Sequence, residues 1–501
     1  MGKHMKRKNI LFVAMDQFRA DLLFGDLSEV AELPNITALM QDAVSFRNHW
    51  SVVTPCGPSR CSLLTGQYAM NHRSVRNGAP LDHMIPTVPG EMRKAGYVPM
   101  LFGYTDTPRD PRVHHPDDPA LRSYEMPMPG FEEKVEMRLD ESYPWRGHLA
   151  ARGYDLPPYE RFYVPNGPDI DSPAFYAKED SDTAFLTDEC LKTLSAMQDA
   201  PWFAHLTYIR PHPPFVAPEP YNRLYNGKTI PAPCALGPDI AKHPLLREAQ
   251  AHSPIQRFLP GVPDLTDTPE TVRTLRQVYL GLATEVDHHI GRMIRFLKDS
   301  GQYDDTLIIL CSDHGEMLGD HGSWGKSTVF DAAFRVPLII RDPGLECAGR
   351  VVDAPTEITD IFPTLLEFAG LDQPTSVDGR SLYPLMRGQV PDDWRDYTWS
   401  ELDFARIPAV QDGLPSNALP FDQCNLSILR EAHLTLVHFN GGLPPLLFDH
   451  RGLGESRNLA DDPAYADDML RLTRRMLDHR MTHADGTLSS YSSSKDGPIR
   501  A

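Results

Sequence analysis

The amino-acid sequence predicts an α/β protein with a mostly parallel central sheet, helices on both faces of that sheet, and a smaller C-terminal antiparallel sheet with a helix. Over residues 1–385, continuous apolar runs alternate with helical patterns, which is typical of a parallel sheet covered on both sides. Beyond residue 385 the apolar runs are short and separated by turn residues, which indicates antiparallel strands. We therefore expect a large domain over residues 1–385 and an α+β subdomain over residues 386–501.

The strands of the central sheet are predicted from apolar runs that stop at polar or turn residues. Residues 9–15 form such a run, which ends at Asp16 and Gln17 and is typical of a strand buried on both faces. The other runs of this kind cover residues 98–102, 202–209, 306–311 and 336–340.

Helices are predicted between these strands. From about residue 270 to residue 298, apolar side chains recur on one face of a long helix. Shorter helices are expected near residue 34, over 56–68 and over 361–368. Residues 108–180 are rich in Pro, Asp, Arg and Tyr without clear periodicity, and we expect them to form loops over the sheet.

The C-terminal region predicts a small antiparallel sheet followed by one amphipathic helix and a Ser-rich tail, which we expect to be mobile. The strand candidates are residues 397–402, 426–430, 434–439 and 446–448, and the helix candidate is residues 467–483.

Composition excludes several classes of protein. The net charge is −19, from 49 Lys and Arg against 68 Asp and Glu, and no basic stripe interrupts it, so we expect no nucleic-acid partner. No segment approaches the roughly 18 apolar residues that a membrane span needs, and the first apolar run is too short for a signal peptide. Seven cysteines, an odd number, do not form a disulfide framework. These features predict a cytoplasmic protein without a membrane partner.

Polar clusters follow three of the predicted strands: Asp16-Gln17, Asp313-His314 and Arg210-Pro-His212. In an open α/β sheet, ligands bind beyond the carboxyl ends of the strands. Carboxylate, carboxamide and imidazole groups gathered there suit a divalent metal. Taken singly, each cluster is better explained by polar residues that cap a turn.

A cysteine motif favours a catalytic site over simple turn capping. In Cys56-Gly-Pro-Ser-Arg60, the cysteine opens a helix and a cation follows one turn later, which favours an anion site and predicts a lowered thiol pKa. Two simpler roles for Cys56 stay open. It could pair with Cys61, which a reducing compartment disfavours, or it could act as a bare thiolate, as in cysteine phosphatases. Those enzymes need Arg six positions later, where this chain has Ser62.

Cys56 to Arg60, with residues 63–66, resembles the signature of type I sulfatases in the alkaline phosphatase superfamily. The resemblance covers most of the chain, including residues 15–17, 211–215, 312–316, 319–326, 335–340 and 447–449. Residues 16–21, 71–81 and 103–105 resemble one branch in particular, the phosphonate monoester hydrolases and their related arylsulfatases. This resemblance implies an alkaline-phosphatase-like catalytic domain over residues 1–385.

The resemblance also implies a mechanism. In this family the cysteine is oxidised by a formylglycine-generating enzyme, and the hydrated formylglycine attacks a small anionic ester and forms a covalent hemiacetal intermediate. The implied substrates are sulfate esters, phosphonate monoesters and phosphodiesters. By position, one divalent metal would be held by Asp16, Gln17, residue 56, Asp313 and His314. Arg60 would orient the nucleophile, His212 would be the general acid, Asn77 and Lys326 would bind anionic oxygens, and Tyr104 and Thr105 would line the pocket.

Two departures from the common sulfatase pattern bear on specificity. The usual Asp pair and Asp-Asn pair are Asp16-Gln17 and Asp313-His314 here, which favours manganese, with calcium or zinc as alternatives. The usual Lys and His after Gly103 are replaced by Tyr104 and Asp106. Because these positions have lost cations, we expect singly charged esters to be preferred over phosphate monoester dianions.

Two further functions stay open at this point: a two-metal phosphatase of the same superfamily with residue 56 unmodified, and a non-catalytic binding protein on this scaffold. We also expect a homo-oligomer, since relatives often assemble through their C-terminal region. Other histidines are predicted to be structural or surface groups, although Asp320 and His321 could support the metal ligands from behind. They are His205, the pair at 114–115 and the pair at 288–289.

Overall fold

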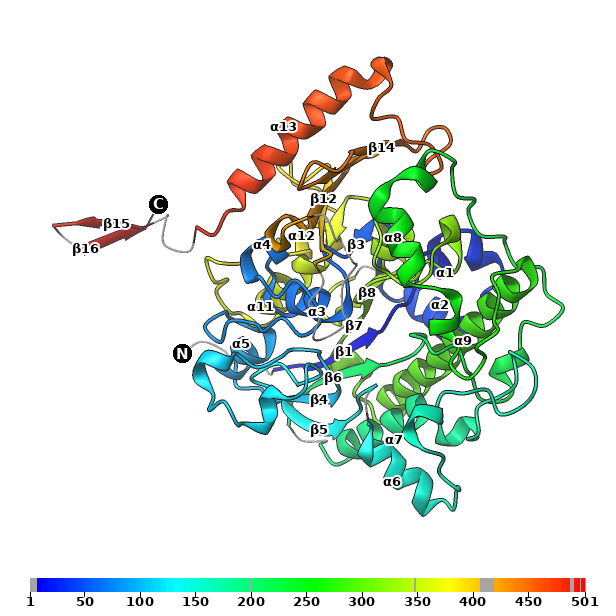
Figure 1. Ribbon diagram of the computed structural model, residues 1–501. Coiled ribbons are helices and arrows are strands. Elements are labelled where there is room, and N and C mark those ends of the chain that lie inside the picture. The colour runs from blue at the N-terminus through cyan, green and yellow to red at the C-terminus, as the bar shows by residue number, and fades with distance from the viewer. Residues whose placement is uncertain are drawn as a thin grey trace.

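The computed structural model describes residues 7–139, 141–197, 200–346, 348–405, 419–486, 491–495 and 497–500. Its centre is an eight-stranded, mostly parallel mixed sheet, which confirms the predicted fold class (Figure 1). Only β8 runs against its two neighbours. In spatial order the strands are β5 (Glu132–Glu136), β4 (Pro99–Gly103), β6 (Phe203–Tyr208), β1 (Asn9–Met15), β7 (Thr306–Ser312), β8 (Leu338–Arg341), β2 (Val44–Phe46) and β9 (Arg350–Val352).

Strand β1 lies at the middle of the core, where its alternate side chains enter two hydrophobic layers. Leu11, Val13 and Met15 pack in one layer, and Ile10 and Phe12 pack in the other. The first layer is covered by α2 (Pro34–Met40), α7 (Asp182–Ser195) and α9 (Pro269–Asp299). The second is covered by α3 (Cys56–Thr65), α5 (Val88–Lys94) and α11 (Ile361–Ala369). Burial on both faces explains why the β1 sequence is continuously apolar.

The prediction that residues 108–180 form only loops is wrong. The structure has an edge strand there, β5, and a helix, α6 (Tyr143–Ala151). Strand β5 reads Glu-Glu-Lys-Val-Glu, and only Val135 in it is buried, so it carries no apolar pattern. Charged side chains are common on exposed edge strands, where they block pairing with other chains.

The remaining short elements lie in connections and were not predicted individually. They include α1 (Asp21–Phe24), α4 (Ala69–His72), α8 (Pro244–His252), α10 (Asp331–Phe334), α12 (Tyr383–Met386), and the paired β3 (His49–Trp50) and β10 (Thr356–Glu357).

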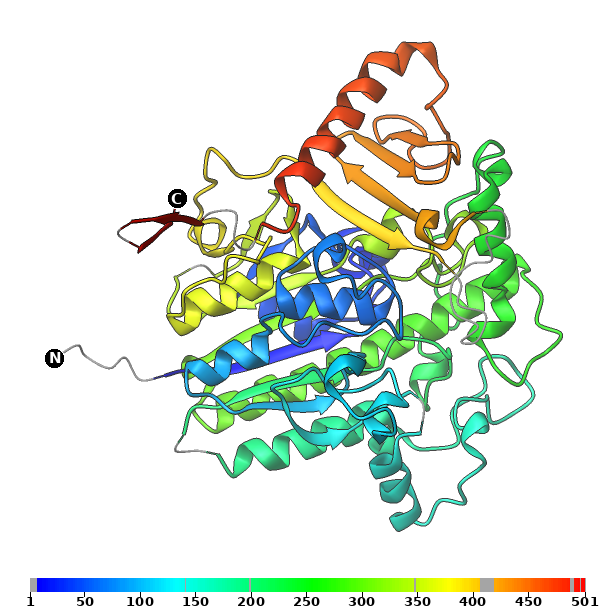
Figure 2. The same ribbon diagram turned by 60° about the vertical axis from the view of Figure 1, so that its left-hand side comes forward.

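The C-terminal region forms the predicted antiparallel sheet, ordered β11 (Thr398–Asp403), β12 (Asn425–Arg430), β13 (Leu434–Phe439) and β14 (Leu446–Asp449). Helix α13 (Ala466–Thr482) packs on it (Figure 2). This sheet is tied to the segment that leads into α3. The amide of Glu401 donates to the carbonyl oxygen of Val52 at 2.8 Å, and Ser400 Oγ donates to the carbonyl oxygen of Ser51 at 2.8 Å.

The tail contains two short antiparallel strands, β15 (Tyr491–Ser494) and β16 (Gly497–Arg500), where the sequence predicted a mobile segment. Figures 1 and 2 show this hairpin projecting away from the body. Within the described ranges, no helix combines the length and the apolar character that crossing a membrane demands.

Candidate active site

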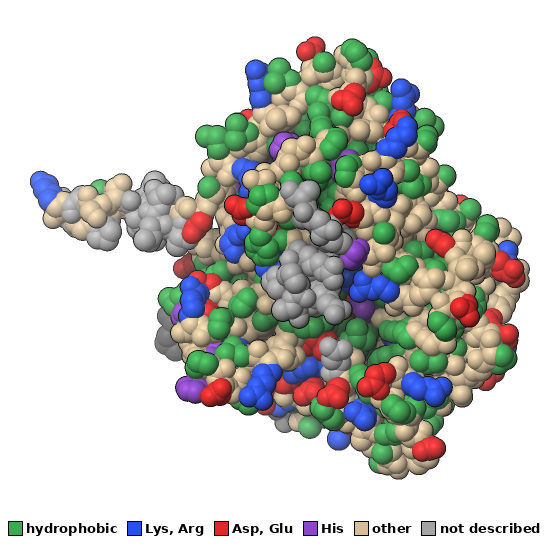
Figure 3. All heavy atoms as spheres, viewed as in Figure 1, with side chains coloured by type: hydrophobic (Ala, Val, Ile, Leu, Met, Phe, Trp, Pro, Cys, Tyr) green, Lys and Arg blue, Asp and Glu red, His purple; other side chains and the backbone are tan. Residues whose placement is uncertain are grey.

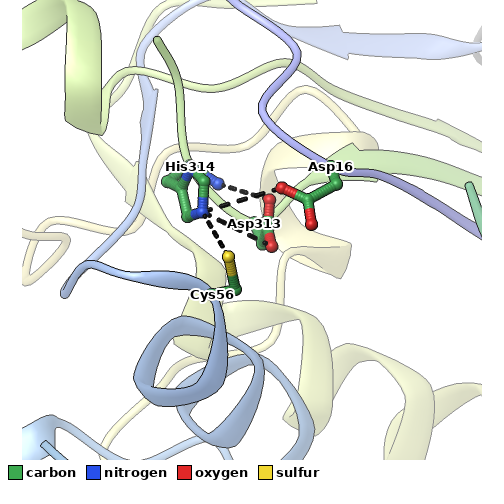
Figure 4. A group of neighbouring side chains, drawn as sticks. All are labelled: Asp16, Cys56, Asp313 and His314. Atoms are coloured by element: carbon green, nitrogen blue, oxygen red, sulfur yellow. Dashed lines mark hydrogen bonds and ion pairs between the residues drawn. The ribbon is translucent and has the colours of Figure 1, made fainter. Parts of the chain in front are cut away.

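The candidate site is built at the carboxyl ends of β1 and β7, which are adjacent and in register, with Met15 opposite Ser312. The next residues along the chain, Asp16 and Asp313, therefore leave the sheet side by side. Cys56 is brought to the same place by the N-terminus of α3. Ligand atoms of Asp16, Cys56, Asp313 and His314 all lie within 4.8 Å of one another, and Figure 4 shows their side chains converging.

Helix α3 is anchored so that its first residue faces this cluster. Ser59 Oγ donates to the carbonyl oxygen of Asp313 at 2.5 Å, and the amide of Gly57 donates to Asn77 Oδ1 at 3.0 Å. The helix ends at Gly66, whose positive φ of 68° suits glycine. The predicted helix over 56–68 is thus confirmed in place and is three residues shorter.

Asp16 presents its two oxygens to different surroundings. Oδ2 accepts hydrogen bonds from Arg60 Nη2 at 2.7 Å and from the Tyr104 hydroxyl at 2.5 Å. Oδ1 is buried without a hydrogen-bond partner and lies 3.7 Å from His314 Nε2. Because an unpaired buried oxygen is costly, this arrangement fits a cation facing Oδ1.

His314 and Asp313 complete a donor set suited to one cation. Nδ1 of His314 donates to the carbonyl oxygen of Gly315 at 3.0 Å, which leaves the lone pair of Nε2 facing the cluster. Burial lowers the pKa of His314, so the ring is neutral. Burial, followed by the neighbouring charge of Asp313, raises the pKa of Asp16. A divalent ion would relieve this repulsion, and oxygen, nitrogen and residue 56 ligands fit a transition metal.

The prediction that the Cys56 thiol has a lowered pKa is wrong. Burial, and next the charge of Asp16, raise that pKa well above its ordinary value. Arg60 does not compensate, because it pairs with Asp16 at 2.7 Å and with Asp313 at 3.0 Å. A bare thiolate is therefore disfavoured here. The disulfide alternative is also excluded, since Cys56 and Cys61 are both free.

Tyr104 and Asp106 surround Arg60 rather than the open cavity. The Arg60 guanidinium stacks 3.9 Å from the centre of the Tyr104 ring, and its Nη1 lies 3.5 Å from Asp106 Oδ2. Burial raises the pKa of Asp106 to about 7. Thr105 is fully buried, and its hydroxyl accepts from the amide of Met128 at 2.6 Å. These residues support the cluster from behind.

A polar chain connects the cluster to the cavity. Lys326 Nζ donates to Gln17 Oε1 at 2.7 Å and to His212 Nε2 at 3.0 Å, and the Gln17 amide group donates to Glu316. Gln17 has a left-handed φ of 67°, and its carboxamide is already held at both ends. Sequence reasoning missed Glu316, which Gly325 also contacts through its amide at 2.6 Å.

The charged groups around this series of hydrogen bonds favour the protonated form of Lys326. Burial opposes the ammonium, but Cys56, Asp16 and Asp313 outweigh it and raise the pKa of Lys326. Burial, and then Lys326, lower the pKa of His212 well below its ordinary value. The imidazole is therefore neutral, with Nδ1 donating to the carbonyl oxygen of Pro213 and Nε2 accepting from Lys326.

The loop that carries His212 is held by Arg210, which is 1% exposed. Its Nη1 donates to the carbonyl oxygens of His212 at 3.1 Å and Pro214 at 3.0 Å, and its Nε donates to Asp182 Oδ2 at 3.0 Å. The sequence singled out the cluster of Arg210 and His212, and the structure shows Arg210 acting on the backbone of that loop.

A cavity of about 330 Å³ opens beside this chain. It contains the predicted residues Gln17, Asn77, His212 and Lys326, together with others that sequence reasoning missed. The missed lining residues are Pro55, Leu139, Pro213, Pro214, His252, Ser253, Arg257, Phe258, Gly325 and Ser327. Most of them lie in loops, with His252 at the end of α8 and Arg257 and Phe258 in a short 3-10 helix, Ile255–Phe258.

The other polar candidates lie elsewhere. Asp320 pairs with Arg19 at 2.8 Å and His321 stacks on Phe330 at 4.2 Å, so neither touches the four clustered groups. His205 is buried between aromatic rings, as predicted for a core group. His289 Nδ1 lies 3.2 Å from Arg292 Nη1, a cationic partner that the sequence did not indicate.

Comparison with known proteins agrees with this geometry. A model of the Sulfatase family matches residues 8–371. The multifunctional alkaline phosphatase superfamily protein PehA of Trinickia caryophylli is 39% identical over 98% of this chain and 99% of its own length. A phosphonate monoester hydrolase from Silicibacter pomeroyi is 54% identical, covers 99% of both chains and superposes with a TM-score of 0.96. The phosphonate monoester hydrolase of Agrobacterium radiobacter is 38% identical, with a TM-score of 0.88 over 99% of this chain and 100% of its own.

Proposed function

The chain belongs to the sulfatase family of the alkaline phosphatase superfamily, and on this premise we propose that it hydrolyses sulfate esters, phosphonate monoesters and phosphodiesters. The observation that carries the proposal is the convergence of Cys56 with Asp16, Asp313 and His314 beside a cavity that contains Lys326 and His212. Four ligand groups within 4.8 Å suit one ion better than the pair of ions in a two-metal phosphatase.

We propose that residue 56 acts as formylglycine, with Asp16, Asp313 and His314 holding one divalent ion, manganese in preference to calcium or zinc. Hydration of the aldehyde would supply one hydroxyl to attack the ester and a second whose deprotonation releases the transferred group. The ion would supply positive charge that lowers the pKa of that nucleophile. Arg60 favours the ionised forms of Asp16 and Asp313 and orients both side chains, and Tyr104 holds the outer oxygen of Asp16. Gln17 contributes by orienting Lys326, and Thr105 by bracing the loop behind Tyr104.

Lys326 and His212 are proposed to work as one acid. In the free protein the proton resides on Lys326, whose Nζ donates to His212 Nε2. A bound anionic ester raises the pKa of both groups, and the negative charge that develops on the departing oxygen draws a proton toward His212. The proton can then pass to His212 Nε2 and on to the departing oxygen. Lys326 and Asn77 line the same cavity, where they would contact the ester's anionic oxygens.

The preference for singly charged esters has a basis in the same cluster. Asp106 lies beside Arg60, so the guanidinium faces carboxylates on several sides and has no unshared charge to offer a dianion. Tyr104, in place of a cation, contributes a neutral hydroxyl. We propose that sulfate monoesters, phosphonate monoesters and phosphodiesters react faster than phosphate monoesters.

The test has two parts. Mass spectrometry of the peptide across Cys56, from protein matured in its own host, should show the aldehyde or its hydrate in place of the thiol. Hydrolysis rates should then be compared on four 4-nitrophenyl esters: the sulfate, the phenylphosphonate, the phenyl phosphate diester and the phosphate monoester. The phosphate monoester, which is the dianion, should react slowest. An intact thiol in fully active protein, or fastest turnover of the phosphate monoester, would overturn the proposal.

We also propose the remaining assignments. Residues 1–385 form the catalytic domain and residues 386–501 the C-terminal subdomain, whose first strand begins at Thr398. A formylglycine-generating enzyme matures Cys56 in the cytoplasm, and the protein works as a homo-oligomer without nucleic acid. On the face in Figure 3, Lys and Arg side chains are interspersed with Asp and Glu, which supports the absence of a nucleic-acid partner.

A further inference from the structure

The active-site cavity has a charge opposite to that of the whole chain. The protein carries a net charge of −19, yet the lining of the 330 Å³ cavity includes Lys326, Arg257, His212 and His252 and, among the residues that the structure describes, no Asp or Glu. Local charge decides what a cavity accepts, because the more distant surface charges are screened beyond about 8 Å. The cavity therefore favours anions at more than one point.

The two cations have different surroundings. Lys326 is half-buried and already donates to Gln17 and His212, next to the nucleophile. Arg257 is exposed, and its Nη1 donates to the carbonyl oxygen of His252 at 2.7 Å. Across the described part of the chain, no carboxylate lies within 4.0 Å of Arg257 to form an ion pair. Its guanidinium thus keeps donors available for a ligand, and two parallel N–H groups match a carboxylate or phosphate.

Arg257 lies on a segment that is joined to the loop of His212. The next residue, Phe258, accepts a hydrogen bond at its carbonyl oxygen from the amide of Phe215 at 2.9 Å, and the two rings stack at 6.0 Å. Phe215 belongs to the loop that begins at Arg210 and carries His212. The turn with Arg257 is therefore fastened to the loop that delivers the proton to the departing oxygen.

The cavity lining also has an apolar wall. Pro213, Pro214, Phe258 and Leu139 contribute to it, in the same lining as half-buried Lys326 and exposed Arg257. A ring or short alkyl group can occupy such a wall, with the reacting ester at the inner end and a second polar group at the outer end.

We propose that Arg257 binds an anionic group, a carboxylate or a phosphate, at the far end of the leaving group, so that the preferred substrates are esters of acidic alcohols or phenols. The inference rests on the proposed function, because it takes His212 as the acid that marks the leaving-group side. It makes Arg257 a specificity-determining residue, and leaving groups with a cation at the same place are disfavoured.

The test uses three matched aryl sulfates or aryl phosphonates, whose phenol carries at its far end a carboxymethyl group, its neutral amide, or a trimethylammonium group. For Arg257→Gln, kcat/KM should fall about 10-fold on the anionic ester, stay within about 2-fold on the amide, and rise on the cationic ester. Comparing variant with parent on each ester cancels differences in intrinsic reactivity.

Arg247→Gln is the matched control, since it removes the same charge from the exposed face of α8, outside the cavity lining. It should leave all three ratios near one. A further arm places the carboxylate on the retained substituent of a phosphonate, where Arg257→Gln should have little effect.

The outcomes separate this inference from the proposed function. Equal losses on all three esters, no loss on any of them, or a loss that follows the carboxylate on the retained group would each overturn the role of Arg257. Parent protein that hydrolyses none of the esters, including the neutral amide, would instead contradict the proposed function.

Discussion

The buried cluster of candidate metal ligands and the open cavity beside it differ in which elements of the chain supply their residues. Asp16, Cys56, Asp313 and His314 come directly from strand ends and one helix start, and three rigid elements fix them. The cavity takes residues from separate connecting segments. Asn77, Leu139, His212 and Lys326 lie in loops, and Arg257 lies in the short 3-10 helix Ile255–Phe258.

This contrast suggests that the cluster determines turnover and the cavity determines which substrates are selected. In the cluster, Asp313 and the outer oxygen of Asp16 are tied to Arg60, and only one carboxylate oxygen of Asp16 faces inward unpaired. In the cavity, Arg257 retains donors for a ligand. Changes in the cluster should therefore remove turnover on every substrate, and changes around the cavity should redistribute activity among substrates.

The largest expected effect is at the nucleophile. Cys56→Ala should lower kcat at least about 10,000-fold on all esters with the fold retained, because no group replaces the attacking oxygen. Cys56→Ser keeps one hydroxyl but cannot expel the transferred group, so it should give at most one turnover and a stable adduct visible in the intact mass. Continuous turnover by either variant would mean that residue 56 is not the nucleophile.

Metal removal should act nearly as strongly and on every substrate alike. Dialysis against a chelator leaves Arg60 as the ion-pair partner of both Asp16 and Asp313, so activity should fall about 100-fold or more and Tm should fall by roughly 3 °C. Manganese should restore both quantities better than calcium does. Asp16→Asn should bind less metal when metal content per chain is measured by mass spectrometry. Full activity in metal-free protein would contradict the cluster's assignment.

Arg210→Lys should have a smaller and selective effect. Lysine keeps the buried charge near Asp182 but cannot donate to the carbonyl oxygens of both His212 and Pro214. If this positions the acid, kcat should fall about 30-fold for poor alkyl leaving groups and within about 3-fold for nitrophenol, which departs without a proton.

The matched control is Arg223→Lys at the exposed ion pair with Asp171, which should leave the leaving-group dependence unchanged. An equal loss on good and poor leaving groups would show that Arg210 serves only the fold.

Replacing Glu285, whose carboxyl group lies near Arg210, should have the smallest effect on activity but a clear effect on stability. Burial, followed by Asp182, raises the pKa of this carboxyl group to about 8. The folded protein then holds a proton that the unfolded chain releases, so this group makes stability fall as pH rises from about 4.5 to 8.

Glu285→Gln should remove that decline and gain about 2 to 4 kcal/mol relative to the parent between pH 5 and pH 8, as measured by urea unfolding. Glu270→Gln, at the exposed start of the same helix, should run parallel to the parent. Parallel curves for Glu285→Gln would show that the carboxyl group is not protonated in the folded state.

Sequence reasoning reached the cluster because its residues lie in short contiguous motifs at the ends of apolar strands. The family resemblance and the fold class are confirmed. Two other predictions failed for physical reasons. The pKa of Cys56 depends first on its burial and then on Asp16, which is distant in sequence, and the charged edge strand β5 has no apolar alternation. Arg257 and Glu316 could not be predicted, because their roles arise from loop packing.

The anchoring of the segment before α3 bears on when the proposed oxidation of Cys56 can take place. Cys56 is 5% exposed, and the strand that fastens residues 51–52 is translated more than 300 residues later. Under the proposed maturation, an oxidising enzyme would therefore have to reach the thiol before the C-terminal sheet has folded onto this segment. That enzyme would then act while the ribosome is still extending the chain toward its C-terminal sheet. Variants that fold early would accumulate protein with an unconverted thiol at residue 56.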